Sequence, residues 1–445
     1  MLDLLSSGVI SFMLNQAQMP ELANSADLVV WQPPVPVFVK DADPTAQAAL
    51  LSTLQTLSGQ GLNTQEQGIW LQQGSMMLAQ NQGTTPFPAA SLTKVATSLA
   101  SLYTFGPNHQ FETLVSATGP IYNGVLQGDL IVQGGGDPLL VWEDAIAIGN
   151  ALNQLGIRQV TGNLLVTGNF MMNFESDRFK SGNLLKQALN QSLWSGEVEA
   201  QYRTLPKGTA RPQVEITGLV SHVGYGSDLL PASTVLLRQK SLPVKQIIKL
   251  MNIYSNNAIS EAMANAVGGP AVVAERAAQL ANVPQQEVLL KNGSGLGVEN
   301  RISPRAVCAM FATLQRYAET SGMTLADFFP ISGTDEGTIE TRKIPRYAVV
   351  KTGTLNDVSA LAGVLPTRDR GLVWFAILNR GSNLDGLRGR QDALLQALSA
   401  QWGVANPVPV AVRPTASVHS VVGFVGDNRR IQTAQAAAEN YWFRQ

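Results

Sequence analysis

The segment Pro88-Ala89-Ala90-Ser91-Leu92-Thr93-Lys94 opens an apolar-periodic stretch that predicts a helix from Ala89 to Tyr103. Positions i and i+3 of a helix share a face, so we expect Ser91 and Lys94 to point the same way at the helix start. A serine hydroxyl is a poor nucleophile unless a neighbouring base takes its proton, and a lysine can be that base when burial or a second cation lowers its pKa. The segment therefore predicts a nucleophile, Ser91, and its base, Lys94.

A second short motif, Ser255-Asn256-Asn257, lies between predicted helices at 244–254 and 258–267. A turn at such a break can direct both flanking side chains into one cleft. We expect the Ser255 hydroxyl to relay a proton to a leaving amine. We expect the Asn257 amide to hold the substrate carbonyl and Lys94.

A third motif, Lys351-Thr352-Gly353-Thr354, begins on a predicted strand at 346–351. Lys351 is expected to be the second cation and, together with Thr352, to bind a carboxylate. Gly353 has no side chain, so a substrate backbone could lie against the strand there. The N–H groups of Thr354 and Ser91 are expected to face an oxyanion.

Each motif alone has a simpler explanation, since Ser91 could be a helix N-cap and Lys351 a solvated strand residue. The set S-x-x-K, S-D-N and K-T-G is instead the signature of penicillin-binding proteins and class A β-lactamases. All three motifs occur here in that order, with Asn256 in place of the aspartate. Their combination favours an enzyme.

Beyond the motifs, the sequence resembles the D-alanyl-D-alanine carboxypeptidase/endopeptidases, the class C low-molecular-mass penicillin-binding proteins, over roughly residues 45–402. Five further segments carry the resemblance: Phe111-Glu112-Thr113, Gly128-Asp129-Leu130 through Gly136-Asp137-Pro138, Asn292-Gly293-Ser294-Gly295-Leu296, Gly333-Thr334-Asp335-Glu336-Gly337-Thr338 with Arg342, and Ser359-Ala360-Leu361-Ala362-Gly363.

This resemblance implies an α/β (α+β) transpeptidase-like domain, with an antiparallel sheet between helices and a β-rich insertion between the first and second motifs. It implies a serine-type D-Ala-D-Ala carboxypeptidase, and also a D,D-endopeptidase, that cleaves peptidoglycan stem peptides through an acyl-enzyme on Ser91. β-Lactams are expected as covalent inhibitors, and no cofactor or metal is expected. Asn169 and Asn292 stand where the family has aspartates, and Val298 stands where it has a basic residue. These differences concern how the enzyme would bind the free end of a diaminopimelyl side chain of the substrate.

The chain has 445 residues, and changes in its sequence pattern predict four parts. Residues 1–44 are expected to form an N-terminal arm or degenerate signal plus linker, and residues 404–445 a Pro-rich linker and C-terminal appendage. The catalytic domain is expected at 45–112 and 235–403. Between them, 113–234 alternates short β-like runs with glycine turns and contains one predicted helix near 142–155. Strands are also predicted at 68–79, 359–364 and 372–378, and helices at 46–57, 269–281 and 387–402.

Composition excludes several other classes of function. The net charge is −1 and charged residues make up 14%, so no basic footprint for nucleic acid is present. The single cysteine, Cys308, lies in an apolar helical pattern that predicts a buried thiol. His109, His222 and His419 share no ligand spacing, which argues against a zinc site or a Ser-His-Asp triad.

The N-terminus has features of a poorly formed export signal. Leu4 to Leu14 is an apolar run, but no Lys or Arg occurs before Lys40 and the run is too short for a membrane span. An uncleaved arm is the alternative. We expect an extracytoplasmic protein without an integral membrane span.

Two other functions remain open at this point. A β-lactamase would carry an acidic deacylation residue in a much shorter chain and would release penicillin quickly. A catalytically inactive cell-wall binder would have lost Ser91 or Lys94, and both are present.

Overall fold

The computed structural model describes residues 43–224, 233–415 and 425–433. The predicted N-terminal signal and nearly all of the linker at 1–44 lie outside the described residues, as does His419. Within the described ranges, no helix has the length and apolar character needed to cross a bilayer.

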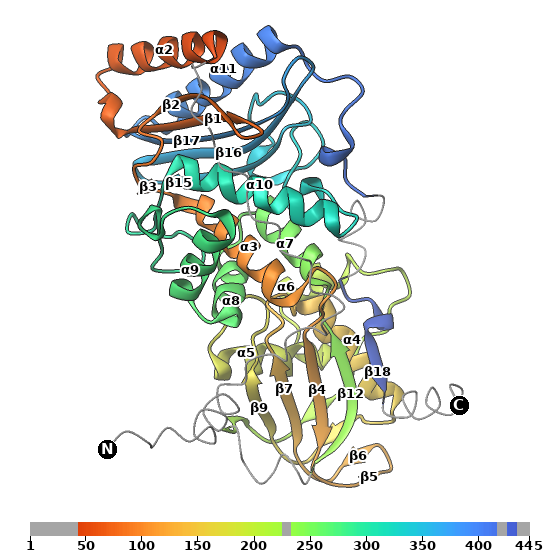
Figure 1. Cartoon of the computed structure of the whole chain (residues 1–445). Helices are drawn as coiled ribbons and strands as arrows, with labels where there is room; N and C mark the ends of the chain where they lie inside the picture. Colours follow the sequence, from red (N-terminus) through yellow and green to blue (C-terminus); the bar gives the residue numbers. More distant parts are fainter. Residues whose placement is uncertain (1–42, 225–232, 416–424, 434–445) are drawn as a thin grey trace, which may run out of the picture.

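A five-stranded antiparallel sheet forms the centre of one end of the molecule (Figure 1). Neighbouring residues of a strand face opposite sides, so Val349 and Val350 belong to different hydrophobic clusters. One face is covered by α2 (Pro44–Gly59) and α11 (Leu384–Trp402), the other by α10 (Pro304–Thr320). The strands, in spatial order, are β15 (Val349–Leu355), β16 (Val358–Thr367), β17 (Gly371–Arg380), β1 (Gln67–Gln73) and β2 (Met76–Asn81).

The single strand predicted at 68–79 is wrong, because the segment forms the hairpin of β1 and β2. Gln73 pairs with Met76, and the two residues between them make the turn. Gly74 has φ +53° there, a left-handed conformation that glycine adopts without a steric penalty. The alternating apolar pattern continues across the turn and therefore does not reveal it.

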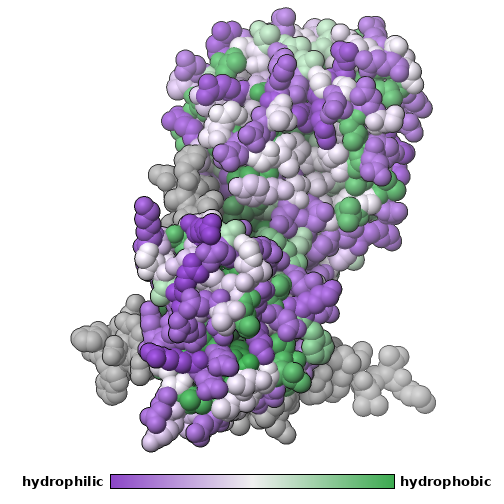
Figure 2. Space-filling view, turned by 180° about the vertical axis from the view of Figure 1, so that it is seen from behind, coloured by the Kyte–Doolittle hydropathy of each residue, from purple (hydrophilic) through white to green (hydrophobic). Residues whose placement is uncertain are grey.

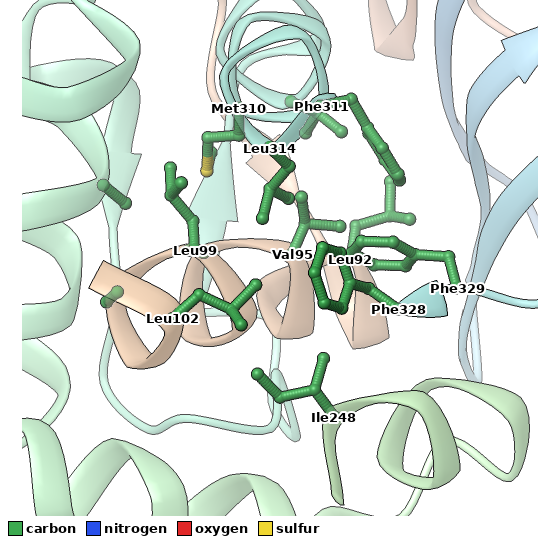
Figure 3. Close-up of a cluster of buried hydrophobic side chains, with 14 of the residues drawn as sticks. Leu92, Val95, Leu99, Leu102, Ile248, Met310, Phe311, Leu314, Phe328 and Phe329 are labelled. Carbon is green, nitrogen blue, oxygen red and sulfur yellow. The ribbon is translucent and has the colours of Figure 1, made fainter. Parts of the chain in front are cut away.

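A group of helices packs beneath this sheet around α3 (Thr93–Phe105). Apolar side chains of α3 and of the preceding Leu92 pack against α10, α7 and the segment at Phe328 (Figure 3). The residues in this cluster are Leu92, Val95, Leu99 and Leu102 on one side, and Met310, Phe311, Leu314, Phe328, Phe329 and Ile248 on the other. Nearly every residue of α3 is buried, so other helices surround it. Small residues of α3 such as Ala96 and Ala100 let these helices approach closely. The surrounding helices are α7 (Val244–Ile253), α8 (Asn257–Val267) and α9 (Pro270–Ala281), close to their predicted bounds, and a small sheet of β13 (Val288–Leu289), β14 (Arg301–Ile302) and β3 (Phe87–Pro88) lies beside them.

The other end of the molecule contains a six-stranded sheet with parallel and antiparallel pairs (Figure 1). Its strands, in spatial order, are β11 (Val220–His222), β9 (Leu164–Asn169), β7 (Leu130–Gly135), β4 (Glu112–Ala117), β12 (Thr234–Lys240) and β18 (Ile431–Thr433). A four-stranded sheet accompanies it, made of β10 (Glu215–Ile216), β8 (Gln159–Val160), β6 (Val125–Leu126) and β5 (Ile121–Tyr122).

Helices in this part are more numerous than predicted. The helix expected near 142–155 is α4 (Trp142–Gln154), which connects the parallel strands β7 and β9. Two more follow, α5 (Arg178–Ala188) and α6 (Gly196–Tyr202). The sequence of α5 is mostly polar and α6 is short, so neither has a strong apolar period.

The two ends of the predicted insertion meet in the six-stranded sheet, where Glu112 of β4 pairs with Lys240 of β12. A separate hydrophobic cluster runs from Val115 to Leu237. Both observations support the predicted division into a catalytic domain and an insertion, which remains a proposal. The C-terminal segment differs from the expected appendage, because β18 pairs with β12 and Val412 is buried in the catalytic core.

Candidate active site

Ser91 lies in a tight turn rather than in the first turn of an α-helix as predicted. It belongs to the 3₁₀ helix Ala90–Leu92, and α3 begins at Thr93. Ala90 has φ +47°, a left-handed conformation that is uncommon outside glycine. Such backbone persists only where the surrounding structure fixes it.

Two glycines let neighbouring backbone approach this turn. A Cβ on Gly353 of β15 would lie 3.1 Å from the Ser91 nitrogen and 3.0 Å from the Ala89 oxygen. A Cβ on Gly295 would lie 1.8 Å from the Ala90 oxygen. Gly353 was expected to make room for substrate. In the structure, its missing side chain also makes room for the Ser91 turn.

The amine of Lys94 is fully buried and touches three oxygens from three elements. Its Nζ lies 3.1 Å from Ser91 Oγ, and it donates to Asn257 Oδ1 at 2.8 Å and to the Ser294 carbonyl at 2.8 Å. The contacts to Ser91 and Asn257 were expected, whereas the Ser294 carbonyl is a backbone acceptor that no motif reveals.

Ser255 lies in the break between α7 and α8, and Asn257 is the first residue of α8, so the two residues flank the break as predicted. Ser255 has φ +53°, which turns the chain sharply before α8 begins. The Asn256 side chain accepts a bond from the Ile259 N–H and caps α8. Asparagine and aspartate both cap helices well, so Asn256 in place of aspartate preserves this local structure.

The third motif lies within β15, the edge strand of its sheet. Lys351 is fully buried, and its Nζ donates to Ser255 Oγ at 3.0 Å and to the Thr352 carbonyl at 2.8 Å. The hydroxyls of Thr352 and Thr338 are 2.8 Å apart. Thr354 is exposed and its Oγ1 accepts a bond from Arg388. All three motifs therefore meet in one place.

Burial dominates the electrostatics of the two lysines. It lowers the pKa of Lys94 to about 7, and the charge of Glu261 acts in the opposite direction. Burial, and then repulsion from Lys94, lowers the pKa of Lys351 well below its usual range. Burial, one of the two causes expected for Lys94, is the larger effect on its pKa.

The other chemically notable residues lie away from this centre. Cys308 is buried, and burial raises the pKa of its thiol well above the usual range, as expected for an inert core residue. His109 stacks on Phe105, and His222 contacts Arg178. Among the described residues, no group of three or more His, Cys, Asp or Glu could hold a metal ion.

Comparison with known proteins places this chain in a family. The D-Ala-D-Ala carboxypeptidase 3 (S13) family matches residues 48–177 and 215–401. The chain belongs to this family. Membership confirms the predicted class, a serine-type D-Ala-D-Ala carboxypeptidase. The unmatched residues between the two ranges include α5 and α6.

Relatives of this S13 chain agree with that assignment. The D-alanyl-D-alanine carboxypeptidase DacB of Haemophilus influenzae is 25% identical over 391 residues, covering 67% of this chain and 81% of that protein. The crystal structure of penicillin binding protein 4 (dacB) from the same organism has a TM-score of 0.58 at 18% identity, covering 79% and 99% of the two chains. The penicillin G acylated Bd3459 predatory endopeptidase of Bdellovibrio bacteriovorus has a TM-score of 0.65 at 21% identity, covering 78% and 94%. These structures confirm the predicted fold class.

A cavity of about 480 Å³ lies beside α8 in this S13 chain. Ala258 and Glu261 line it from α8, Asn169 lines it from β9, and Arg178 lines it from α5. The other two departures from the family pattern lie elsewhere. Asn292 caps its own loop by accepting from the Gly295 N–H, and Val298 is exposed.

Sequence reasoning left out three groups that support the S13 site: the Ser294 carbonyl, the Thr338 hydroxyl and the Glu261 carboxylate. Ser294 and Thr338 occur in segments that carry the family resemblance, but no side-chain pattern assigns them a contact. Glu261 had a usable signal, because it follows Asn257 by four residues and thus shares a face of α8 with it.

The contact between β15 and the Ser91 turn generates a prediction. Gly353→Ala should lower the rate of acylation by a β-lactam about 100-fold, since the added methyl displaces Ser91 by a fraction of an ångström. Gly59→Ala is the control, because a Cβ there meets nothing within 4 Å. Both variants should melt within a few degrees of the parent. Near-parental acylation by a folded Gly353→Ala protein would contradict this account of the turn.

Proposed function

We propose that Ser91 is the nucleophile of a D-Ala-D-Ala carboxypeptidase that acts on peptidoglycan stem peptides and is acylated by β-lactams. The observation that carries this proposal is the arrangement of Lys94 between one hydroxyl and two carbonyl-type oxygens. Burial, which brings the pKa of Lys94 to about 7, leaves a large fraction of the amine neutral near pH 7. The family assignment supplies the substrate class.

The neutral amine has two N–H groups and one lone pair. Asn257 Oδ1 and the Ser294 carbonyl can only accept hydrogen bonds from it, so together they use both N–H groups. The lone pair then points to Ser91 Oγ, which is the remaining neighbour at 3.1 Å. Ser91 donates its proton to Lys94 as its oxygen attacks the peptide carbonyl.

The rest of the reaction uses the other two motifs. The N–H groups of Ser91 and Thr354 stabilise the oxyanion, and the place of β15 at the edge of its sheet leaves one side of the strand without a neighbouring strand of that sheet. Lys351 and Thr352 hold the terminal carboxylate of the substrate. The Ser255 hydroxyl, which accepts a bond from Lys351, passes its proton to the departing D-Ala amine. The proton that Lys94 took from Ser91 then restores the Ser255 hydroxyl, which leaves Lys94 neutral again. Water then hydrolyses the ester on Ser91, with Lys94 again taking a proton.

The same machinery would act on a D,D-cross-link, which makes endopeptidase activity part of the proposal. A β-lactam offers an amide carbonyl beside a carboxylate and would acylate Ser91. A carboxypeptidase keeps this adduct, whereas a β-lactamase would hydrolyse it quickly, so the lifetime of the adduct separates the two functions.

We also propose that the chain works outside the cytoplasmic membrane, because peptidoglycan lies there. Fractionation of the native cells should recover it in the extracytoplasmic fraction. Recovery from the cytosol alone would contradict the location and weaken the assigned substrate.

The protonation state of Lys94 predicts the pH dependence of acylation. The rate constant for labelling by a fluorescent penicillin should rise with pH, with a midpoint near 7, because only the neutral amine can take the proton. Lys94→Arg should lose at least about 100-fold in rate at every pH, since a guanidinium stays protonated. A flat profile, or efficient labelling of Lys94→Arg, would refute the role of Lys94.

The carboxylate site is tested with two pentapeptides, one ending in D-Ala-D-Ala and the other in its C-terminal amide. Release of the last residue from the acid should fall about 10-fold in kcat/KM in Thr352→Ala, the loss expected for a hydrogen bond to a charged group. The amide should be a poor substrate for both proteins and should lose little further rate. Equal losses for both peptides would show that Thr352 does not bind the carboxylate.

A further inference from the structure

Glu261 holds the loop that carries the Ser294 carbonyl. Its two carboxylate oxygens accept from the Gly293 N–H at 2.9 Å and from the Ser294 N–H at 3.0 Å. On the other side of the same loop, the Gly293 carbonyl accepts from Thr97 Oγ1 at 2.8 Å and from Ser260 Oγ at 2.7 Å. The carboxylate of Glu261 and the hydroxyls of Thr97 and Ser260 thus fix the backbone at residues 293–294.

The position of this loop matters for the base. The Ser294 carbonyl is one of the two acceptors that use the N–H groups of Lys94, and so it decides where the lone pair points. The Ser294 N–H that Glu261 holds belongs to the same residue. A shift of the loop would therefore turn the lone pair away from Ser91.

We propose that Glu261 is a positioning residue for the reaction, which fixes the Ser294 carbonyl and, through its negative charge, sets the pH range in which Lys94 can act as base. The inference rests on the proposed function of Lys94. Two observations support it: the paired bonds from Glu261 to the loop, and the bond that Lys94 donates to the carbonyl of the same loop.

The charges around Lys94 agree with this role. Glu261 on α8 raises the pKa of Lys94 against the larger effect of burial, and Lys351 on β15 is a second buried amine that interacts with Lys94. Charged groups on the other helices packed against α3 have partners of their own: Lys249 of α7 pairs with Asp335, Arg276 of α9 bonds to Thr104 at the far end of α3, and Arg316 of α10 bonds to Thr313.

The test compares Glu261→Gln with Ser260→Ala, which removes a neutral bond to the same loop. The readout is the rate of labelling by a fluorescent penicillin as a function of pH. Loss of the charge in Glu261→Gln should move the midpoint down by roughly half a pH unit or more. It should also lower the plateau about 10-fold, because the loop is less well held. Ser260→Ala should lower the plateau alone.

A second pair, Glu261→Asp and Glu261→Asn, compares a charged with a neutral side chain that are both one methylene shorter than the parental one. This pair replaces the first test if Glu261→Gln does not fold. The aspartate variant should keep the parental midpoint and the asparagine variant should not. Parental midpoints in both neutral variants would overturn the inference, as would an equal shift in Ser260→Ala. A parent protein with no pH-dependent labelling would instead refute the proposed function, so the two failures are distinguishable.

Discussion

Lys94 lies inside the protein with no exposed surface, and its amine contacts oxygens from the Ser91 turn, from α8 and from the loop at Ser294. A buried amine without hydrogen-bond partners would cost several kcal/mol, so these three elements must converge on one point. That requirement explains why α3 is buried on all sides and why helices from distant parts of the chain surround it (Figure 3). It also explains how a lysine can be neutral near physiological pH.

The space around Ser91 is limited by backbone rather than by side chains. Gly353 and Gly295 approach the turn from β15 and from the Ser294 loop. A Cβ at Gly295 would overlap the Ala90 carbonyl, and a Cβ at Gly353 would make tight contacts with the turn. Ala90 and Ser255 adopt left-handed conformations at the two turns that carry the first and second motifs. Packing from both sides offsets the cost of these conformations and fixes Ser91 relative to the edge of the sheet.

Figure 2 shows the opposite side of the molecule, where polar side chains cover much of the surface of both ends.

Sequence patterns located the candidate site, but they did not reveal the groups that hold its residues in place. Ser91, Lys94, Ser255 and Lys351 are recognisable because their reactive groups are side chains in ordered motifs. The Ser294 carbonyl is a backbone atom, and a sequence contains no sign of where a given carbonyl points. β18 could not be predicted for another reason. It has only three residues, and its partner strand β12 lies nearly two hundred residues earlier in the chain. The hairpin at Gly74 was missed because its apolar alternation passes unbroken through the turn.

The central claim is that Ser91 forms the acyl-enzyme. The most direct test is the mass of the intact protein after treatment with penicillin, followed by identification of the modified peptide. The account predicts one adduct, on the peptide that contains Ser91, and no adduct on a folded Ser91→Ala protein. An adduct of the same mass on Ser91→Ala, or on a peptide without Ser91 in the parent protein, would show that the nucleophile lies elsewhere.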